Sequence, residues 1–143
     1  MIVYVFMIIS TVILSFGIKK YKKEKKKSLE FVFKFMAFLI PFLIMGLRYD
    51  VGQDYFFTYV PVFESIKLFG NYEGVEWGYI LLNKLVLFFT QDYAGIFIVT
   101  SAIFCGFIYK AIMDNSKDIS LSLYILFTSS FLFYAMDVVR ESI

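Results

Sequence analysis

The sequence contains no histidine and only one cysteine, Cys105. The lack of histidine excludes His-based acid–base catalysis, the Ser-His-Asp arrangement and most zinc sites. A single cysteine cannot form an internal disulfide, and within an apolar run it usually behaves as a small hydrophobe. Neither a phosphate-cradling glycine pattern nor a metal-ligand spacing occurs. We therefore expect no metal and no cofactor.

Charged residues are also scarce. They make up 18% of the 143 residues, whereas 60% are hydrophobic and 22% aromatic. Soluble domains are typically about 25% charged and about 45–50% apolar, so a soluble fold could not bury this much apolar surface. The composition predicts an all-α, polytopic transmembrane helix bundle, with residues 1–143 forming a single membrane domain.

Long apolar runs predict four membrane-spanning helices, because a helix needs about 20 apolar residues to cross a bilayer. Seven of the fourteen basic residues lie in the segment 19–27, which follows the first run. Such a lysine-rich loop marks the cytoplasmic side and predicts an external N-terminus. Because the loop joins two spans, we expect no nucleic acid partner. The expected spans are about residues 1–18, 29–47, 93–113 and 119–136.

Residues 54–69 do not fit a span, because charges lie near both ends. Apolar side chains recur there at helical spacing and leave a more polar opposite side. This pattern predicts an interfacial amphipathic helix on the outer surface, broken at Pro61. The repeating apolar positions are Tyr55, Tyr59, Val62, Phe63 and Ile66.

Residues 79–90 form a second short segment. A dozen apolar residues in a helix reach about 18 Å, against a hydrocarbon thickness of about 30 Å. We therefore predict a short outer-leaflet or re-entrant helix. Glu76, Asn83 and Lys84 lie along one helical side, which we expect to face a cavity.

Two arginines, Arg48 and Arg140, each follow a predicted span and emerge on the external side in this topology. Arginine remains charged and binds phosphate groups bidentately. Asp50, Asp54 and Glu76 are candidates for a general base. Interfacial anchoring, with local ion pairs such as Arg48–Asp50, remains the alternative interpretation.

The segment from Arg48 to Tyr55, Arg-Tyr-Asp-Val-Gly-Gln-Asp-Tyr, resembles the first signature of the EpsG-like family. These proteins are Wzy-type polytopic membrane proteins of bacterial exopolysaccharide synthesis. The segment 76–82, which begins Glu-Trp-Gly-Tyr, resembles the next block of the family. Residues 139–143 resemble the start of a later block, and Gln53 stands where the family pattern leads us to expect threonine. Because family members continue through further spans, we expect the chain to be truncated at its C-terminus.

The resemblance implies polymerisation of exopolysaccharide repeat units carried on a polyprenyl diphosphate, at the external face of the bacterial plasma (inner) membrane. The alternative is a non-catalytic transporter or assembly subunit of a polysaccharide export system. Expected partners are the lipid-linked oligosaccharide, membrane lipids and other polysaccharide-assembly proteins. The resemblance implies catalytic roles for Arg48, Arg140, Asp54 and Glu76. It implies substrate binding by Asp50, Gly52, Gln53, Tyr55, Tyr59, Trp77 and Tyr79.

Overall fold

The computed structural model describes residues 2–51 and 54–129, and every element in them is a helix. This confirms the all-α prediction for the described residues. The elements are α1 (Ile2–Lys23), α2 (Lys27–Gly46), the π-helix η1 (Tyr55–Tyr59), α3 (Val60–Phe69), α4 (Trp77–Phe89), α5 (Ala94–Asn115) and α6 (Ile119–Thr128).

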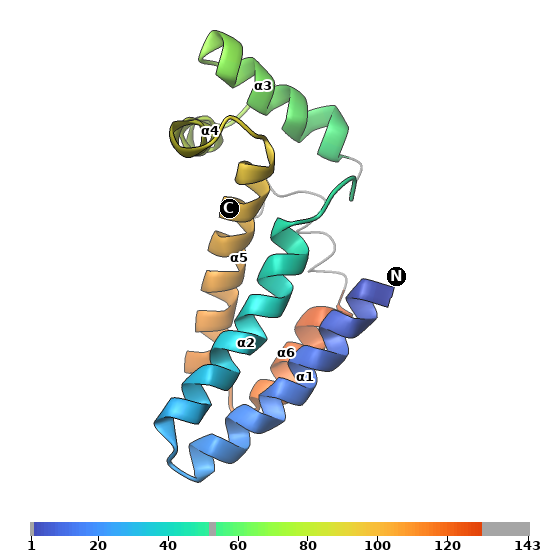
Figure 1. Ribbon diagram of the computed structural model, residues 1–143, viewed down its shortest axis with the longest axis vertical. Helices are drawn as coiled ribbons and strands as arrows, with labels where there is room; N and C mark the ends of the chain where they lie inside the picture. The colour runs from blue at the N-terminus through green and yellow to red at the C-terminus, as the bar shows by residue number, and fades with distance from the viewer. Residues whose placement is uncertain (1, 52–53, 130–143) are drawn as a thin grey trace.

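The helices α1, α2, α5 and α6 run roughly along the long axis of the molecule (Figure 1). The helix α1 forms an antiparallel hairpin with α2 and also packs against α6, while α2 packs against α5. The loops that join α1 to α2 and α5 to α6 therefore lie at one end. The end of α2 and the start of α5 lie at the other.

Three helices, α1, α2 and α5, are long and apolar enough to cross a membrane. The fourth expected span, 119–136, coincides at its start with α6, and residues 130–136 lie outside the described residues.

The helix α1 extends five residues past the predicted end at position 18. Lysines in its last turn interact favourably with the C-terminal end of the helix dipole and so support this extension.

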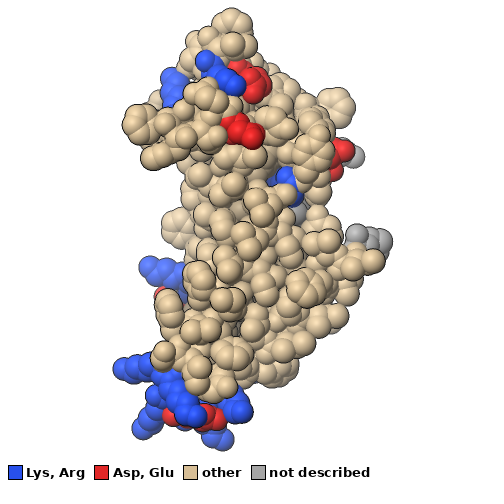
Figure 2. All heavy atoms as spheres, in the orientation of Figure 1, with Lys and Arg blue, Asp and Glu red and all other residues tan. Residues whose placement is uncertain are grey.

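The surface has the charge distribution of a membrane protein. Lysines gather at the end formed by the α1–α2 loop, and a broad band without charge separates most of them from the charges at the opposite end (Figure 2). Large apolar side chains are exposed within the spans, and burying them in lipid removes them from water. They include Phe6, Ile13 and Phe16 of α1, Phe31 and Phe35 of α2, and Phe107 of α5.

Small and polar side chains bring the helices of the bundle close together. The hydroxyl of Ser15 in α1 donates a hydrogen bond to the hydroxyl of Ser120 in α6 at 2.8 Å, and both residues are buried. A Cβ atom on Gly46 would lie 3.4 Å from the Cα atom of Ile98 in α5. Such residues are typical of membrane interfaces, where close backbone approach and interhelical hydrogen bonds replace the hydrophobic effect.

The elements η1, α3 and α4 form a cap at the end of the bundle opposite the lysine-rich loop (Figure 1). The axis of α4 is seen nearly end-on in this view, so α4 runs across the long axis of the bundle. The apolar core of the cap includes Ile96 and Phe97 from the start of α5 and is distinct from the core among α1, α2, α5 and α6. The buried side chains of η1 and α3 are Tyr55, Tyr59, Val62, Phe63 and Ile66, the same five that the helical spacing indicates.

The sequence pattern suggested a break in the helix at Pro61, but the structure has none there. The π-helix η1 passes directly into α3, and Pro61 lies in the first turn of α3. A proline has no amide hydrogen to donate, and the π-helical turn directly before it is where the hydrogen-bond pattern of the helix changes. The helix α3 ends at Gly70, whose φ of 75° is the left-handed conformation of a helix C-terminus.

Candidate functional site

Arg48 follows directly after α2 and Leu47, at the cap end of the bundle. It is buried, with 8% of its surface exposed. Its guanidinium carbon lies 5.0 Å from the centroid of the Phe97 ring, near the start of α5. A cation–π pair of this kind contributes about 0.5 to 2 kcal/mol, more when it is shielded from water. The ring therefore fixes a permanent positive charge at the junction of the spans and the cap.

Phe97 is the centre of an aromatic cluster that joins α5 to the cap. The ring of Tyr55 stacks on it at 4.6 Å with an interplanar angle of 4°. Tyr59 meets it edge-on at 5.8 Å and also contacts Tyr79 of α4 at 6.1 Å. The cluster therefore brings together four of the predicted site residues, Arg48, Tyr55, Tyr59 and Tyr79, around a fifth residue that was not predicted.

The Tyr55 phenol remains protonated at physiological pH. Desolvation by burial raises its pKa, and the neighbouring Tyr93 and Tyr49 add to this shift, against a smaller opposing effect of Arg48. A neutral phenol does not act as a base near pH 7. The Tyr55 side chain is buried with its ring stacked on Phe97, so it suits aromatic packing more than proton transfer.

The loop after Arg48 turns sharply. Asp50 has a φ of 52°, a left-handed conformation that aspartate tolerates better than most residues. This turn leaves the Asp50 side chain exposed, while the ring of Tyr49 lies edge-on to Tyr55 at 5.9 Å. The loop therefore has an exposed carboxylate, that of Asp50, two residues after the buried Arg48.

Asp54 and Glu76, the other two candidate bases, have different surroundings. Asp54 precedes η1, is half-buried and accepts a hydrogen bond from the Thr58 hydroxyl at 3.2 Å. Glu76 precedes α4 and is exposed. Trp77, the next residue, is 76% exposed, so its ring lies outside the aromatic cluster. Of the two carboxylates, Asp54 is adjacent in sequence to the cluster, because Tyr55 follows it.

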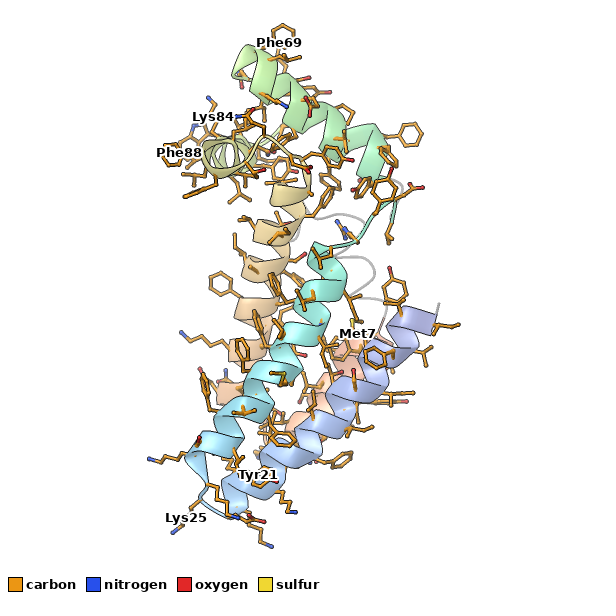
Figure 3. The ribbon with its side chains drawn as sticks, viewed as in Figure 1. Met7, Tyr21, Lys25, Phe69, Lys84 and Phe88 are labelled. Atoms are coloured by element: carbon orange, nitrogen blue, oxygen red, sulfur yellow. The ribbon has the colours of Figure 1, made fainter. Side chains whose placement is uncertain are left out.

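The polar side of α4 does not line a common cavity as expected. Asn83 is completely buried in the cap core, where its amide donates a hydrogen bond to the backbone oxygen of Tyr79 at 2.7 Å. Lys84 is exposed, and Figure 3 shows it extending outward from α4. Adjacent residues of a helix differ by about 100° in direction, so one of them can pack while the next contacts solvent.

Three predicted site residues, Gly52, Gln53 and Arg140, lie outside the described residues. In residues 2–51 and 54–129, no group of three or more histidine, cysteine, aspartate or glutamate side chains is arranged to hold a metal ion.

Phe97 was not predicted from the sequence, because it is one of several phenylalanines in an apolar run. Its only distinguishing signal is its position one helical turn inside the start of α5, four residues after Tyr93. Its importance depends on contacts with Arg48 and Tyr55, which are distant in sequence.

Comparison with protein families gives one match, in which residues 31–143 fit the sequence model described as the EpsG family. The match includes every predicted site residue. Comparisons with curated proteins and with solved structures found no match.

Proposed function

The chain belongs to the EpsG family of membrane proteins in polysaccharide biosynthesis, and from this premise we propose that it takes part in polymerising exopolysaccharide repeat units. The substrates are oligosaccharides carried on a polyprenyl diphosphate at the external face of the bacterial plasma membrane. The observation that supports this function best is the buried Arg48, held against Phe97 where the spans meet the cap.

The reaction is a glycosyl transfer. A hydroxyl of one lipid-linked unit attacks the anomeric carbon of another, which forms the new glycosidic bond and breaks the bond to the diphosphate. The polyprenyl diphosphate leaves with an additional negative charge, and the acceptor hydroxyl gives up a proton.

Arg48 has the chemistry to bind the diphosphate and to stabilise the charge that develops on it. A guanidinium donates parallel hydrogen bonds to phosphate oxygens, and a fixed cation shielded from water stabilises such charge strongly. We assign Arg140 the same role. Asp54 or Glu76 receives the proton of the acceptor hydroxyl.

The aromatic residues suit a sugar-binding role. Tyr55 and Tyr59 pack on the Phe97 ring that contacts the guanidinium, and Tyr79 packs on Tyr59. Asp50, Gly52, Gln53 and Trp77 belong to the same proposed substrate site, on the loop and at the start of α4.

The test is polymer production in a host that lacks its chromosomal copy of the gene and expresses variants at matched membrane levels. Arg48→Ala should lower polymer yield by roughly tenfold or more, because loss of a charged hydrogen-bonding partner costs about 1.5–3 kcal/mol. Arg48→Lys should retain part of the activity, since lysine keeps the charge but not the bidentate geometry. Lys84→Ala, which removes an exposed cation at the same end, is the matched control and should leave yield unchanged.

Unchanged polymer yield and length in Arg48→Ala would contradict the proposal. Lipid-linked units that are bound but never elongated, by wild type as well as by variants, would instead identify a transporter or assembly subunit.

A further inference from the structure

A groove runs from the cap end of the bundle between the start of α1 and the end of α2. Its volume is about 460 Å³. Most of its accessible lining belongs to apolar atoms, and several lining side chains are themselves exposed at the surface of the bundle. The lining residues are Val3, Tyr4, Leu43, Ile44, Leu47, Arg48 and Val51.

Among the described residues that line the groove, Arg48 is the one that carries a charge. It follows the last turn of α2, so it lies at the cap end of the groove, while Leu43 and Ile44 lie one turn or more deeper along the span. One end of the groove is therefore positively charged, and the rest of it is apolar.

This distribution is complementary to a lipid with an anionic head. Within a bilayer, an apolar chain gains little by leaving other lipid tails, so a bound lipid needs a polar anchor to be selected. Arg48 supplies that anchor and is oriented by Phe97. A groove of several hundred Å³ is also the usual size of a binding site for one small ligand.

We propose that this groove binds the first isoprene units of the polyprenyl carrier, next to the diphosphate that Arg48 holds. The inference rests on the proposed function, because it takes the carrier lipid from it. A polyprenyl diphosphate has a single chain joined directly to a doubly phosphorylated head, which matches one groove ending at one guanidinium. A phospholipid has two chains that diverge from a glycerol backbone, and only one of them would fit.

The experiment is site-specific photocrosslinking in the full chain, purified in lipid nanodiscs. A photoreactive amino acid replaces Leu43 in the groove or, as the matched control, Phe107, which is 71% exposed on α5 and lies outside the groove. The probe is a radiolabelled polyprenyl diphosphate, with unlabelled polyprenyl diphosphate, polyprenol or phosphatidylglycerol as competitors.

Position 43 should be labelled and position 107 should not. Excess polyprenyl diphosphate should remove the label, whereas polyprenol and phosphatidylglycerol should not. Arg48→Ala should lower the labelling at position 43 by roughly tenfold, since a charged hydrogen bond contributes about 1.5–3 kcal/mol.

Three results would overturn the inference. Equal labelling at positions 43 and 107, or equal competition by phosphatidylglycerol, would mean that the groove holds ordinary membrane lipid. Crosslinks from position 43 to residues 130–143 in place of the probe would mean that the chain itself covers the groove.

A second variant separates this inference from the proposed function. Leu43→Trp fills the groove without touching Arg48 and should raise the KM for the lipid-linked substrate, while Phe107→Trp should not; thermal stability of both variants checks their folding. If position 43 is not labelled but Arg48→Ala still lowers polymer yield, the groove proposal is wrong and the proposed function is retained. If labelling succeeds but Arg48→Ala makes normal polymer, the function falls and lipid binding stands.

Discussion

The guanidinium of Arg48 lies over the ring of Phe97, 5.0 Å from its centroid, and this pair joins the end of α2 to the start of α5. The same ring stacks on Tyr55 and meets Tyr59 edge-on, so it is one of the side chains that join the cap to α5. The position of the proposed substrate-binding charge therefore depends on the packing of the cap.

Replacing Phe97 with leucine should weaken both the fold and the site. The change removes a cation–π pair and an aromatic stack, for an expected loss of roughly 1–3 kcal/mol in unfolding free energy. Polymer yield should fall as well, because Arg48 is no longer oriented. The measurements are thermal unfolding in detergent and polymer yield at matched expression.

Phe107→Leu is the control for this prediction, since it makes the same change on an exposed surface of the same helix. If Phe97→Leu and Phe107→Leu behaved alike, the ring of Phe97 would have no special role in holding the cap.

Gly95 allows the sharp connection between α4 and α5. A Cβ atom there would lie 2.6 Å from Cγ2 of Thr90 and 2.7 Å from Cγ1 of Val86. Both neighbours must shift to accept it, so Gly95→Ala should destabilise the protein by about 1–3 kcal/mol, as overpacking usually does. Thermal unfolding measures the effect.

Gly106→Ala is the matched control on the same helix, because its added Cβ meets no atom within 4 Å among the described residues outside its neighbours and the backbone of its own helix. It should be neutral or slightly stabilising, since alanine is the better helix former by about 1 kcal/mol. The double variant with Thr90→Ser, which removes Cγ2, should recover part of the loss; no recovery would mean that the strain arises elsewhere.

Much of the cap could be predicted from local spacing. The buried side chains of η1 and α3 repeat every three or four residues, so the pattern identifies their packed face without knowledge of the partner. The direction of α4 could not be predicted in this way. A short apolar helix has the same composition whether it enters the bilayer or lies across its surface, so its direction depends on packing such as the close approach of Gly95 to Thr90 and Val86.

The candidate site could be predicted only in part, because some of its residues stand out in the sequence and others do not. Arg48 stands out because a charge directly after an apolar run is rare, whereas Phe97 is hidden among other apolar residues. Asn83 and Lys84 have similar polarity and adjacent positions, so the sequence alone did not indicate that one is buried and the other exposed. The failure at Phe97 concerns contacts with Arg48 and Tyr55, which are far from it in the chain.

The ion pair between Lys19 and Asp118 should make stability depend on acid pH. The Lys19 ammonium and the backbone amide of Leu121 donate hydrogen bonds to the Asp118 carboxylate, and they hold its pKa below the usual 3.8. A depressed pKa in the folded state stabilises the protein above the unfolded pKa. That stability is lost as pH falls through the folded value.

Wild type should therefore have a higher Tm than Asp118→Asn at neutral pH, and the difference should vanish well below pH 4. The effect should be small, because the Asp118 side chain is 51% exposed and solvent screens the pair. Asp114→Asn, in the same loop, is the control. A Tm difference that persisted unchanged into acid would show that the carboxylate charge is not responsible.

The orientation of the bundle can be tested with single cysteines, because the natural Cys105 is buried. Tyr72 lies in the turn between α3 and α4 at the cap end, and Lys23 ends α1 at the lysine-rich end; both are exposed. A membrane-impermeant maleimide should label Tyr72→Cys in intact protoplasts or spheroplasts and should label Lys23→Cys only after permeabilisation. The reason is that lysine-rich loops stay on the cytoplasmic side. Labelling of position 23 from outside would place Arg48 and the groove in the cytoplasm, where units displayed on the outer face could not reach them.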